Sequence, residues 1–334
     1  MSGPSCTATI VVLPFRDDPM NITDRHIIFT VDLEDWFQVE NLKQEISFTS
    51  WSSRELRVEE NTHRILDLLD SMRQKGASGP LQATFFVLGW IAERLPHLVR
   101  EIYSRGHEVA SHGYFHRCCN ESPSEDLEKD LVDSKNLLED IIGDRIYGYR
   151  APSFSINDDV LKIIEACGYS YDSSYNSFAL HGRYGKVDLS GYPRKGIATK
   201  LSESFYEIPI SNLKLCKRMN SFKTIQNSKV KIQNLIVPWG GGGYFRLIPL
   251  FIFRLGVQSI LKREDAYLFY IHPWEIDPGQ PRIDTIPAFY RFRHYVNLSR
   301  TRHKVSALFS HLEGCRFVTC RDYLELMGRK ADSQ

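Results

Sequence analysis

The sequence predicts an α/β protein whose parallel strands form a barrel-like sheet. Short apolar runs with strand character alternate with longer runs that have helical spacing, as in repeated strand–helix units. In addition, five of the apolar runs lead into side chains with catalytic chemistry: Asp32, His112, Arg150, Asp172 and His272. Active sites of α/β barrels form at the carboxyl ends of the strands. We therefore expect these five side chains to lie in one site.

The first half of the chain carries the regular part of this pattern. We expect strands over 27–31, 83–88, 107–111 and 146–149, and helices over 61–72, 96–104, 122–142 and 158–167. The helix near residue 122 has a clear start, because Ser122, Pro123 and Glu125 fit a capping serine, a first-turn proline and a capping-box glutamate. Gly143 and Gly168 follow the last two helices and are expected to end them.

The second half is less regular. We expect short strands over 169–171, 206–210 and 266–271, and a long loop over the polar stretch 176–204. The segment from Trp239 to Arg246 contains four consecutive glycines. They predict a tight turn rather than a P-loop, because no Lys-Ser or Lys-Thr follows. The apolar run over 247–261 is expected to be a core-facing helix, with a membrane-surface helix as the alternative.

Composition narrows the class of protein. The net charge of +1 gives no electrostatic reason to expect nucleic acid as a partner. The seven cysteines include no Cys-x-x-Cys pair, so neither a disulfide scaffold nor a thiolate zinc site is expected. No apolar stretch reaches the ~18 residues of a membrane span, and the N-terminus lacks the apolar core of a signal peptide. We expect a disordered leader over 1–24, a single domain over 25–330 and a cytoplasmic location, with peripheral contact to a membrane left open.

His112 and His116 are the strongest candidates for metal ligands. They lie four residues apart where an expected strand ends, and carboxylates come from the end of another strand. Two histidines and one carboxylate bind a divalent metal and leave positions open for water and substrate. Strand alternation places Asp32 and Glu34 on one face, whereas a strand that ends at Asp32 would let Asp35 turn in. The carboxylate ligand is therefore Glu34 or Asp35.

The remaining strand-end residues suit proton transfer and positioning. Asp32 is the candidate general base, and Arg150 is expected to orient an active-site carboxylate. The pKa range of a histidine suits His272 to donate a proton near neutral pH. Asp172 or Glu275 could hold its ring, although Asp172 could equally cap a turn.

These motifs closely resemble those of the polysaccharide deacetylases of the NodB-homology type, carbohydrate esterase family 4. Four segments carry the resemblance: Thr30-Val31-Asp32-Leu33-Glu34-Asp35-Trp36, Ala110-Ser111-His112-Gly113-Tyr114-Phe115-His116, Tyr149-Arg150-Ala151-Pro152 and Phe269-Tyr270-Ile271-His272. It covers about residues 26–275. The C-terminal part over 234–325 resembles the subgroup encoded with bacterial exopolysaccharide and exosortase systems.

The resemblance implies a distorted (β/α) barrel and one divalent metal, usually zinc, with cobalt or another divalent ion as an alternative. It also implies removal of N-acetyl groups from N-acetylhexosamine units of a bacterial polysaccharide or its precursor. The implied metal ligands are His112, His116 and either Glu34 or Asp35. The implied oxyanion donor is the backbone N–H of Ser153, at a position where the family often has tyrosine.

Besides Ser153, one further departure from the family pattern and two alternative functions accompany this expectation. The adjacent Asp-Asp pair of the family is replaced here by Asp32-x-Glu34-Asp35, which is why the metal carboxylate is left open. One alternative function is hydrolysis of a small, ureide-like amide on the same scaffold. The other is a non-catalytic, carbohydrate-binding relative, and the presence of metal, base, arginine and acid candidates speaks against it.

Overall fold

The computed structural model describes residues 25–73, 79–178, 185–215 and 235–331. Its strands are β1 (His26–Leu33), β2 (Thr84–Val87), β3 (Glu108–Ser111), β4 (Gly148–Tyr149), β5 (Tyr171–Asp172), β6 (Arg194–Lys195), β7 (Ala198–Lys200), β8 (Tyr206–Glu207), β9 (Asn212–Leu215), β10 (Leu235–Pro238), β11 (Ala266–Ile271) and β12 (Arg316–Phe317). Its helices are α1 (Val58–Ser71), α2 (Gly89–Arg94), α3 (Pro96–Ser104), α4 (Ser124–Ile142), α5 (Asp158–Ala166), α6 (Gly242–Leu247), α7 (Leu250–Leu261), α8 (Ala288–Tyr295), α9 (Leu298–His311) and α10 (Cys320–Ala331).

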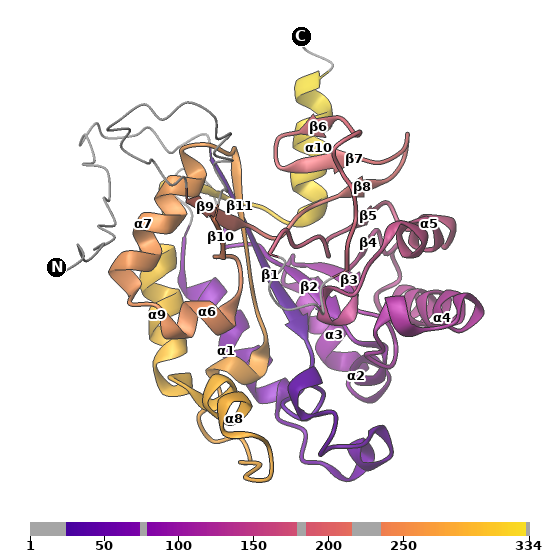
Figure 1. Ribbon diagram of the computed structural model, residues 1–334, viewed down its shortest axis with the longest axis vertical. Helices are drawn as coiled ribbons and strands as arrows, with labels where there is room; N and C mark the ends of the chain where they lie inside the picture. Colours follow the sequence, from indigo (N-terminus) through magenta and orange to yellow (C-terminus); the bar gives the residue numbers. More distant parts are fainter. Residues whose placement is uncertain (1–24, 74–78, 179–184, 216–234, 332–334) are drawn as a thin grey trace, which may run out of the picture.

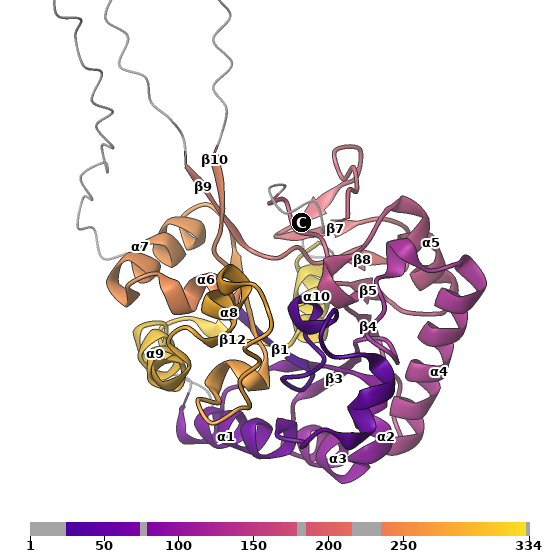
Figure 2. The same cartoon turned by 60° about the horizontal axis from the view of Figure 1, so that its bottom comes forward.

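One curled sheet carries most of these strands. Its order is β11-β1-β2-β3-β4-β5-β8-β7-β6, and β12 pairs with the first residues of β1. The pairs from β11 to β8 are parallel, whereas β8, β7 and β6 are joined by antiparallel pairs. Helices α1 to α5 lie around the outside of the curve (Figures 1 and 2). The expected barrel-like α/β fold is confirmed, in the form of a half-barrel.

The side chains of β1 divide between two hydrophobic cores. Ile27 and Phe29 belong to the larger core, which the outer helices share, and Ile28 belongs to a second core on the concave side of the sheet. This division follows from the two-residue period of a strand. Thr30 and Asp32 continue the row of Ile28. The polar end of β1 therefore faces the concave side.

Helix α10 closes the concave side at the amino ends of the strands. The N–H of Cys320 donates to Thr84 Oγ1 at 2.8 Å, and the N–H of Arg321 donates to Glu108 Oε2 at 3.1 Å. Both acceptors lie where β2 and β3 begin. Tyr323 of α10 belongs to the concave-side core, and the helix lies within the curve of the sheet in Figure 2. The opposite end, where the strands finish, is the end that holds the pocket described below.

Two expected elements differ in the structure. The stretch over 176–204 was expected to be a loop, but it contains the antiparallel pair β6 and β7, between which Gly196 turns the chain at φ 61°. Two-residue hairpin turns need such positive φ values, which glycine adopts without strain. Helix α4 begins at Ser124, and Ser122 does not cap it, because the Ser122 hydroxyl donates to the carbonyl of Cys118.

The apolar run over 247–261 is only partly a core-facing helix. Phe253 and Val257 of α7 are buried in the larger core, whereas Phe251 is 67% exposed and Leu255 is exposed as well.

Within the ranges that the structure describes, no helix combines the length and apolar character needed to cross a membrane. The expected leader over 1–24 lies outside the described residues. Strands β11 and β12 both return to pair with β1, so distant parts of the chain share one sheet.

Candidate active site

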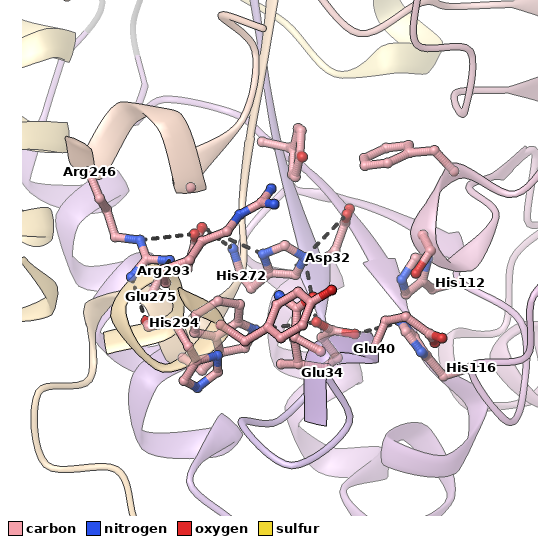
Figure 3. Close-up of a pocket in the computed structure, with 18 of the residues that line it drawn as sticks. Asp32, Glu34, Glu40, His112, His116, Arg246, His272, Glu275, Arg293 and His294 are labelled. Carbon is pink, nitrogen blue, oxygen red and sulfur yellow. Dashed lines mark hydrogen bonds and ion pairs between the residues drawn. The ribbon is translucent and has the colours of Figure 1, made fainter. Parts of the chain in front are cut away.

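A pocket of about 240 Å³ opens where β1, β3 and β11 end. Seven residues expected from the sequence line it: Asp32, Glu34, His112, His116, Ser153, His272 and Glu275. Figure 3 shows His112 and His116 on one side of the pocket, with Asp32 and His272 near its middle and Glu275 and Arg246 on the opposite side. Residues that follow strands in distant parts of the chain thus lie in one pocket, as expected for the carboxyl ends of parallel strands.

Glu34, His112 and His116 form a group that could hold a metal ion. One potential ligand atom from each lies within 4.8 Å of the other two. Glu34 Oε2 lies 2.7 Å from His116 Nε2, yet among the described residues this buried oxygen has no hydrogen-bond partner of acceptable geometry. Burial disfavours the charged carboxylate, but the neighbouring His116 and His272 outweigh it and lower the pKa of Glu34 to about 2. An ionised carboxylate beside two imidazoles fits a divalent cation.

His112 is oriented for ligation by the backbone. Its Nδ1 lies 2.8 Å from the carbonyl oxygen of Arg150, to which the Nδ1–H donates. A neutral imidazole carries one proton, so this contact leaves the lone pair on Nε2. Burial lowers the pKa of His112 to about 4, which keeps the ring neutral near pH 7.

The loop between the two histidines is held by Asp130 of α4. Its carboxylate accepts from the N–H groups of Tyr114 at 2.7 Å and Phe115 at 3.2 Å. Gly113 adopts φ +73°, and a Cβ at that position would lie 2.8 Å from Asp130 Oδ2. Glycine therefore meets two needs here, the left-handed conformation and the close approach of the carboxylate.

Asp35 does not join the histidines. Its carboxylate accepts from three N–H groups, those of Trp36 at 2.8 Å, Arg57 at 2.8 Å and Val58 at 3.0 Å, and the last of these opens α1. Burial raises the pKa of Asp35 to about 6, although these N–H groups act in the opposite direction. Since β1 continues to Leu33, the alternation of the strand brings Glu34 to the pocket. The structure thus places Glu34, and not Asp35, beside the histidines.

Asp32 is paired with Arg150 beneath the pocket. Arg150 is fully buried, and its Nη1 donates to Asp32 Oδ1 at 2.6 Å and to Thr30 Oγ1 at 2.7 Å. Its Nε and Nη2 donate to the carbonyl and hydroxyl of Ser173 at 2.8 and 2.9 Å. The guanidinium therefore holds one oxygen of Asp32 in place. The other oxygen, Oδ2, lies 3.8 Å from His272 Nε2.

His272 lies between carboxylates on both sides of its ring. Its Nε2 is 3.5 Å from Glu34 Oε1, and its Nδ1 is 3.5 Å from Glu275 Oε2. Burial alone would lower its pKa, but Glu34, Glu275 and Asp32 outweigh burial and raise the pKa to about 9. Glu275 is held in turn by Arg246, whose Nε lies 3.2 Å from Glu275 Oε1. These contacts suit His272 to act as a proton donor.

Comparison with known proteins identifies two domain families along the chain. Residues 50–171 match the family model described as polysaccharide deacetylase, and residues 173–325 match the model of a domain of unknown function, DUF3473. Residues 50–171 form a polysaccharide deacetylase domain. A peptidoglycan-N-acetylglucosamine deacetylase of Bacillus cereus is 36% identical over 108 residues, which cover 32% of this chain and 47% of that protein. A chitooligosaccharide deacetylase of Sinorhizobium fredii is 31% identical over 101 residues, which cover 30% of this chain and 44% of that protein.

The chain spans less than half the length of these curated relatives. Among solved structures, a polysaccharide deacetylase homologue from Mycobacterium smegmatis has a TM-score of 0.57 at 17% identity, covering 94% of this chain and 93% of the other. The Puue allantoinase has a TM-score of 0.53 at 14% identity, with coverage of 91% and 90%. At such identities the likeness concerns the fold alone. It shows that the chain shares its half-barrel fold with both proteins.

Asp172 does not hold the ring of His272. Its carboxylate accepts from the N–H of Ser174 at 2.9 Å and from the Ser174 hydroxyl at 2.8 Å, the pattern of a turn-capping aspartate. Glu207 lies beside it in the sheet, and burial raises the pKa of Glu207 well above its usual value. Glu275 occupies the place beside His272 that was considered for Asp172. The correction follows from the turn after β5, which directs Asp172 to Ser174.

Ser153 lines the pocket from a strained turn. Ser153 and Phe154 adopt φ values of 55° and 58° in the short 3-10 turn Pro152–Phe154. Two successive non-glycine residues in the left-handed region carry a conformational cost, and such strain concentrates at functional sites. The turn directly follows Arg150. The segment that pairs with Asp32 therefore also sets the backbone of this wall.

Some pocket residues had no clear signal in the sequence. The indole Nε1 of Trp274 donates to Glu34 Oε1 at 3.2 Å, and Arg246 supports Glu275. Glu40 and Arg293 also line the pocket. Arg246 follows the four consecutive glycines, for which the sequence predicted a tight turn. A charged residue within an apolar segment was the one hint that it is buried and paired.

Proposed function

We propose that the protein is a metal-dependent hydrolase that removes N-acetyl groups from N-acetylhexosamine units of a bacterial polysaccharide or its precursor. The observation that carries this proposal is the group Glu34, His112 and His116 beside the Asp32–Arg150 pair and His272 in one pocket. The names of the relatives support it, because they include deacetylases of peptidoglycan and of chitooligosaccharides.

Glu34, His112 and His116 are the residues that would hold the metal. When bound, a divalent ion such as zinc makes a water molecule more acidic and polarises the amide carbonyl. The role of the three residues is to fix the ion at the end of β1 and β3. Trp274 donates to the second oxygen of Glu34 and so orients the carboxylate.

Asp32 and His272 are the proposed proton-transfer groups. Asp32 takes the proton of the attacking water on Oδ2, because Oδ1 is engaged by Arg150. His272 then protonates the departing amine, and Glu275 orients its ring. The backbone N–H of Ser153 donates to the oxyanion of the tetrahedral intermediate. Loss of either proton-transfer group should lower the rate by about 10²–10⁴-fold.

The test is acetate release from N-acetylglucosamine oligomers by purified protein with zinc, with cobalt and with chelator. The decisive variant is His112→Ala, and the matched control is His97→Ala. His97 lies on α3, where its exposed ring pairs with Glu59 at 2.6 Å. We expect metal-dependent acetate release that His112→Ala abolishes and His97→Ala retains.

Other outcomes distinguish the alternatives. Hydrolysis of ureides without acetate release would show that the substrate is a small amide and not a saccharide, and it would leave the proposed metal site unchanged. Oligomer binding without hydrolysis by the folded, metal-loaded protein would indicate a carbohydrate-binding relative. Acetate release that survives both the chelator and His112→Ala would refute the proposed site.

A further inference from the structure

Arg293 differs from the other arginines around the pocket. Arg150 is paired with Asp32 and Arg246 is paired with Glu275. Arg293 lines the pocket, but in the described part of the chain its guanidinium forms no ion pair with a carboxylate. Figure 3 shows Arg293 on the side of the pocket opposite His112 and His116. The pocket therefore has one wall with an arginine that is in ion-pair contact with none of the carboxylates of the described residues.

The position of Arg293 is fixed through the backbone of α8. The guanidinium of Arg246 donates to the carbonyls of Arg293 at 3.1 Å, His294 at 2.7 Å and Val296 at 3.1 Å. These carbonyls lie at the end of α8, where a buried cation stabilises the groups that the helix leaves unpaired. The next ring, His294, stacks on Trp274 with centroids 4.4 Å apart. The wall that presents Arg293 is thus rigidly tied to the segment that carries His272.

The printed side-chain contact of Arg293 is with an aromatic ring rather than with a carboxylate. Its guanidinium carbon lies 5.6 Å from the centre of the Tyr244 ring, a cation–π contact that leaves the N–H donors at its edge for other partners. The planar fork of an arginine matches a carboxylate or a phosphate through two parallel hydrogen bonds. A site of this kind recognises an anionic group on the ligand.

Aromatic residues of the same helix complete this wall. Phe289 and Tyr290 of α8 line the pocket, and Phe289 is 66% exposed. An exposed aromatic face can pack against the apolar face of a sugar ring, because such a face gains from burial without needing polar partners. One turn of α8 thus combines a surface for a sugar ring with a donor for an anion.

We propose that Arg293 binds an anionic group carried by the saccharide, next to the sugar whose acetamide enters the site. The anion is a carboxylate of an acidic sugar or a phosphate ester, and Phe289 packs against the ring that bears it. This inference rests on the proposed function for the presence of a saccharide. It goes further by naming the charge of the substrate and the residue that selects it.

The test measures binding, so that its result does not depend on hydrolysis. The full chain is immobilised and saccharides flow over it in surface plasmon resonance, where constant supply prevents depletion by turnover. Tetra-N-acetylchitotetraose is the neutral probe, and a tetrasaccharide of alternating glucuronate and N-acetylglucosamine is the carboxylate probe. N-acetylglucosamine 1-phosphate, compared with N-acetylglucosamine, is the phosphate probe. The variant is Arg293→Gln, and the matched control is Arg291→Gln on the same helix, where Arg291 is exposed and faces Asp284.

We expect at least one anionic probe to bind at least about tenfold more tightly than its neutral counterpart, as for charge-assisted, two-point contacts. Arg293→Gln should remove this preference, Arg291→Gln should keep it, and high salt should weaken it in the unmodified protein. The probe that shows the preference identifies the source of the anion.

Three results would overturn the inference. They are the absence of any preference for an anionic probe, a preference that Arg293→Gln leaves intact, and a preference that salt does not change. The salt series uses the unmodified protein, so it decides the question even if Arg293→Gln misfolds. An inactive protein that prefers anionic saccharides would remove the proposed hydrolysis and leave this inference standing. A protein that releases acetate but shows no preference for anionic saccharides would support the proposed hydrolysis and refute this inference.

Discussion

The buried pair of Asp32 and Arg150 leads to a quantitative prediction about stability. The two side chains are 2% and 0% exposed, and their nearest atoms lie 2.6 Å apart. For charge centres about 4 Å apart at an effective dielectric constant of about 20, Coulomb's law gives an attraction of about 4 kcal/mol. Removal of one partner from a buried pair costs about 3–5 kcal/mol, because the other charge is left uncompensated. Arg150→Met should therefore lower the free energy of unfolding by about 3–5 kcal/mol.

A double-mutant cycle in urea unfolding tests this value. The cycle compares Arg150→Met, Asp32→Asn and the double variant, which has no buried charge left unpaired. The two single variants each lose unfolding free energy. We expect the loss in the double variant to be smaller than the sum of these two losses by at least about 2 kcal/mol. Strictly additive losses, or a loss under about 1 kcal/mol for Arg150→Met, would show that the pair does not carry the energy assigned to it.

Three further predictions concern other residues of the fold and the site. Burial lowers the pKa of His107 to about 4, from 6.5 in the unfolded chain. As the pH falls from about 7.5 to about 5, the unfolded state therefore takes up this proton before the folded state does. The free energy of unfolding should fall by about 2 kcal/mol over this range. Urea unfolding at both pH values should show that His107→Phe removes this loss, and an unchanged pH dependence would contradict it. Glu34→Gln should lose most of the zinc affinity measured by calorimetry, whereas Asp35→Asn should retain it; equal losses would contradict the assignment of Glu34. Gly148→Ala should lower the free energy of unfolding by about 1–3 kcal/mol, because its Cβ would lie 2.0 Å from the ring of Tyr171, and an unchanged melting temperature would show that the ring can move away.

The sequence predicted the parts of the site that depend on strand periodicity. An apolar run that ends in a polar residue places that residue at the carboxyl end of a strand, whatever the rest of the chain does. For this reason Asp32, His112 and His272 could be assigned to one pocket before the structure was known. Alternation along β1 placed Glu34 on the face of Asp32, and Asp35 stayed the alternative ligand. The sequence did not determine the last residue of β1. If the strand ended one residue earlier, Asp35 rather than Glu34 would turn toward the pocket.

The remaining parts depend on tertiary contacts that leave no periodic signal. Asp172 follows a strand of two residues, and a hydrogen bond to Ser174 decides its direction. Arg246 and Arg293 lie in short helices whose positions are set by contacts with η6, the 3-10 turn Pro273–Ile276, and with each other. Glycine-rich and short helical segments have no repeat long enough to fix a face. Their side chains could therefore not be assigned to the pocket from the sequence.

The register between β1 and β11 explains why the C-terminal region belongs to the site. Val31 of β1 pairs with Ile271 of β11, so the next residues of the two strands, Asp32 and His272, emerge side by side. Their side chains consequently approach to 3.8 Å although 240 residues separate them along the chain. The region matched by the polysaccharide deacetylase model ends at residue 171, before β11 begins. Without the region matched by DUF3473, β1 would keep β2 but lose β11 and β12, and the pocket would lose the histidine that faces Asp32. That second region is therefore a structural half of the pocket rather than an addition to it.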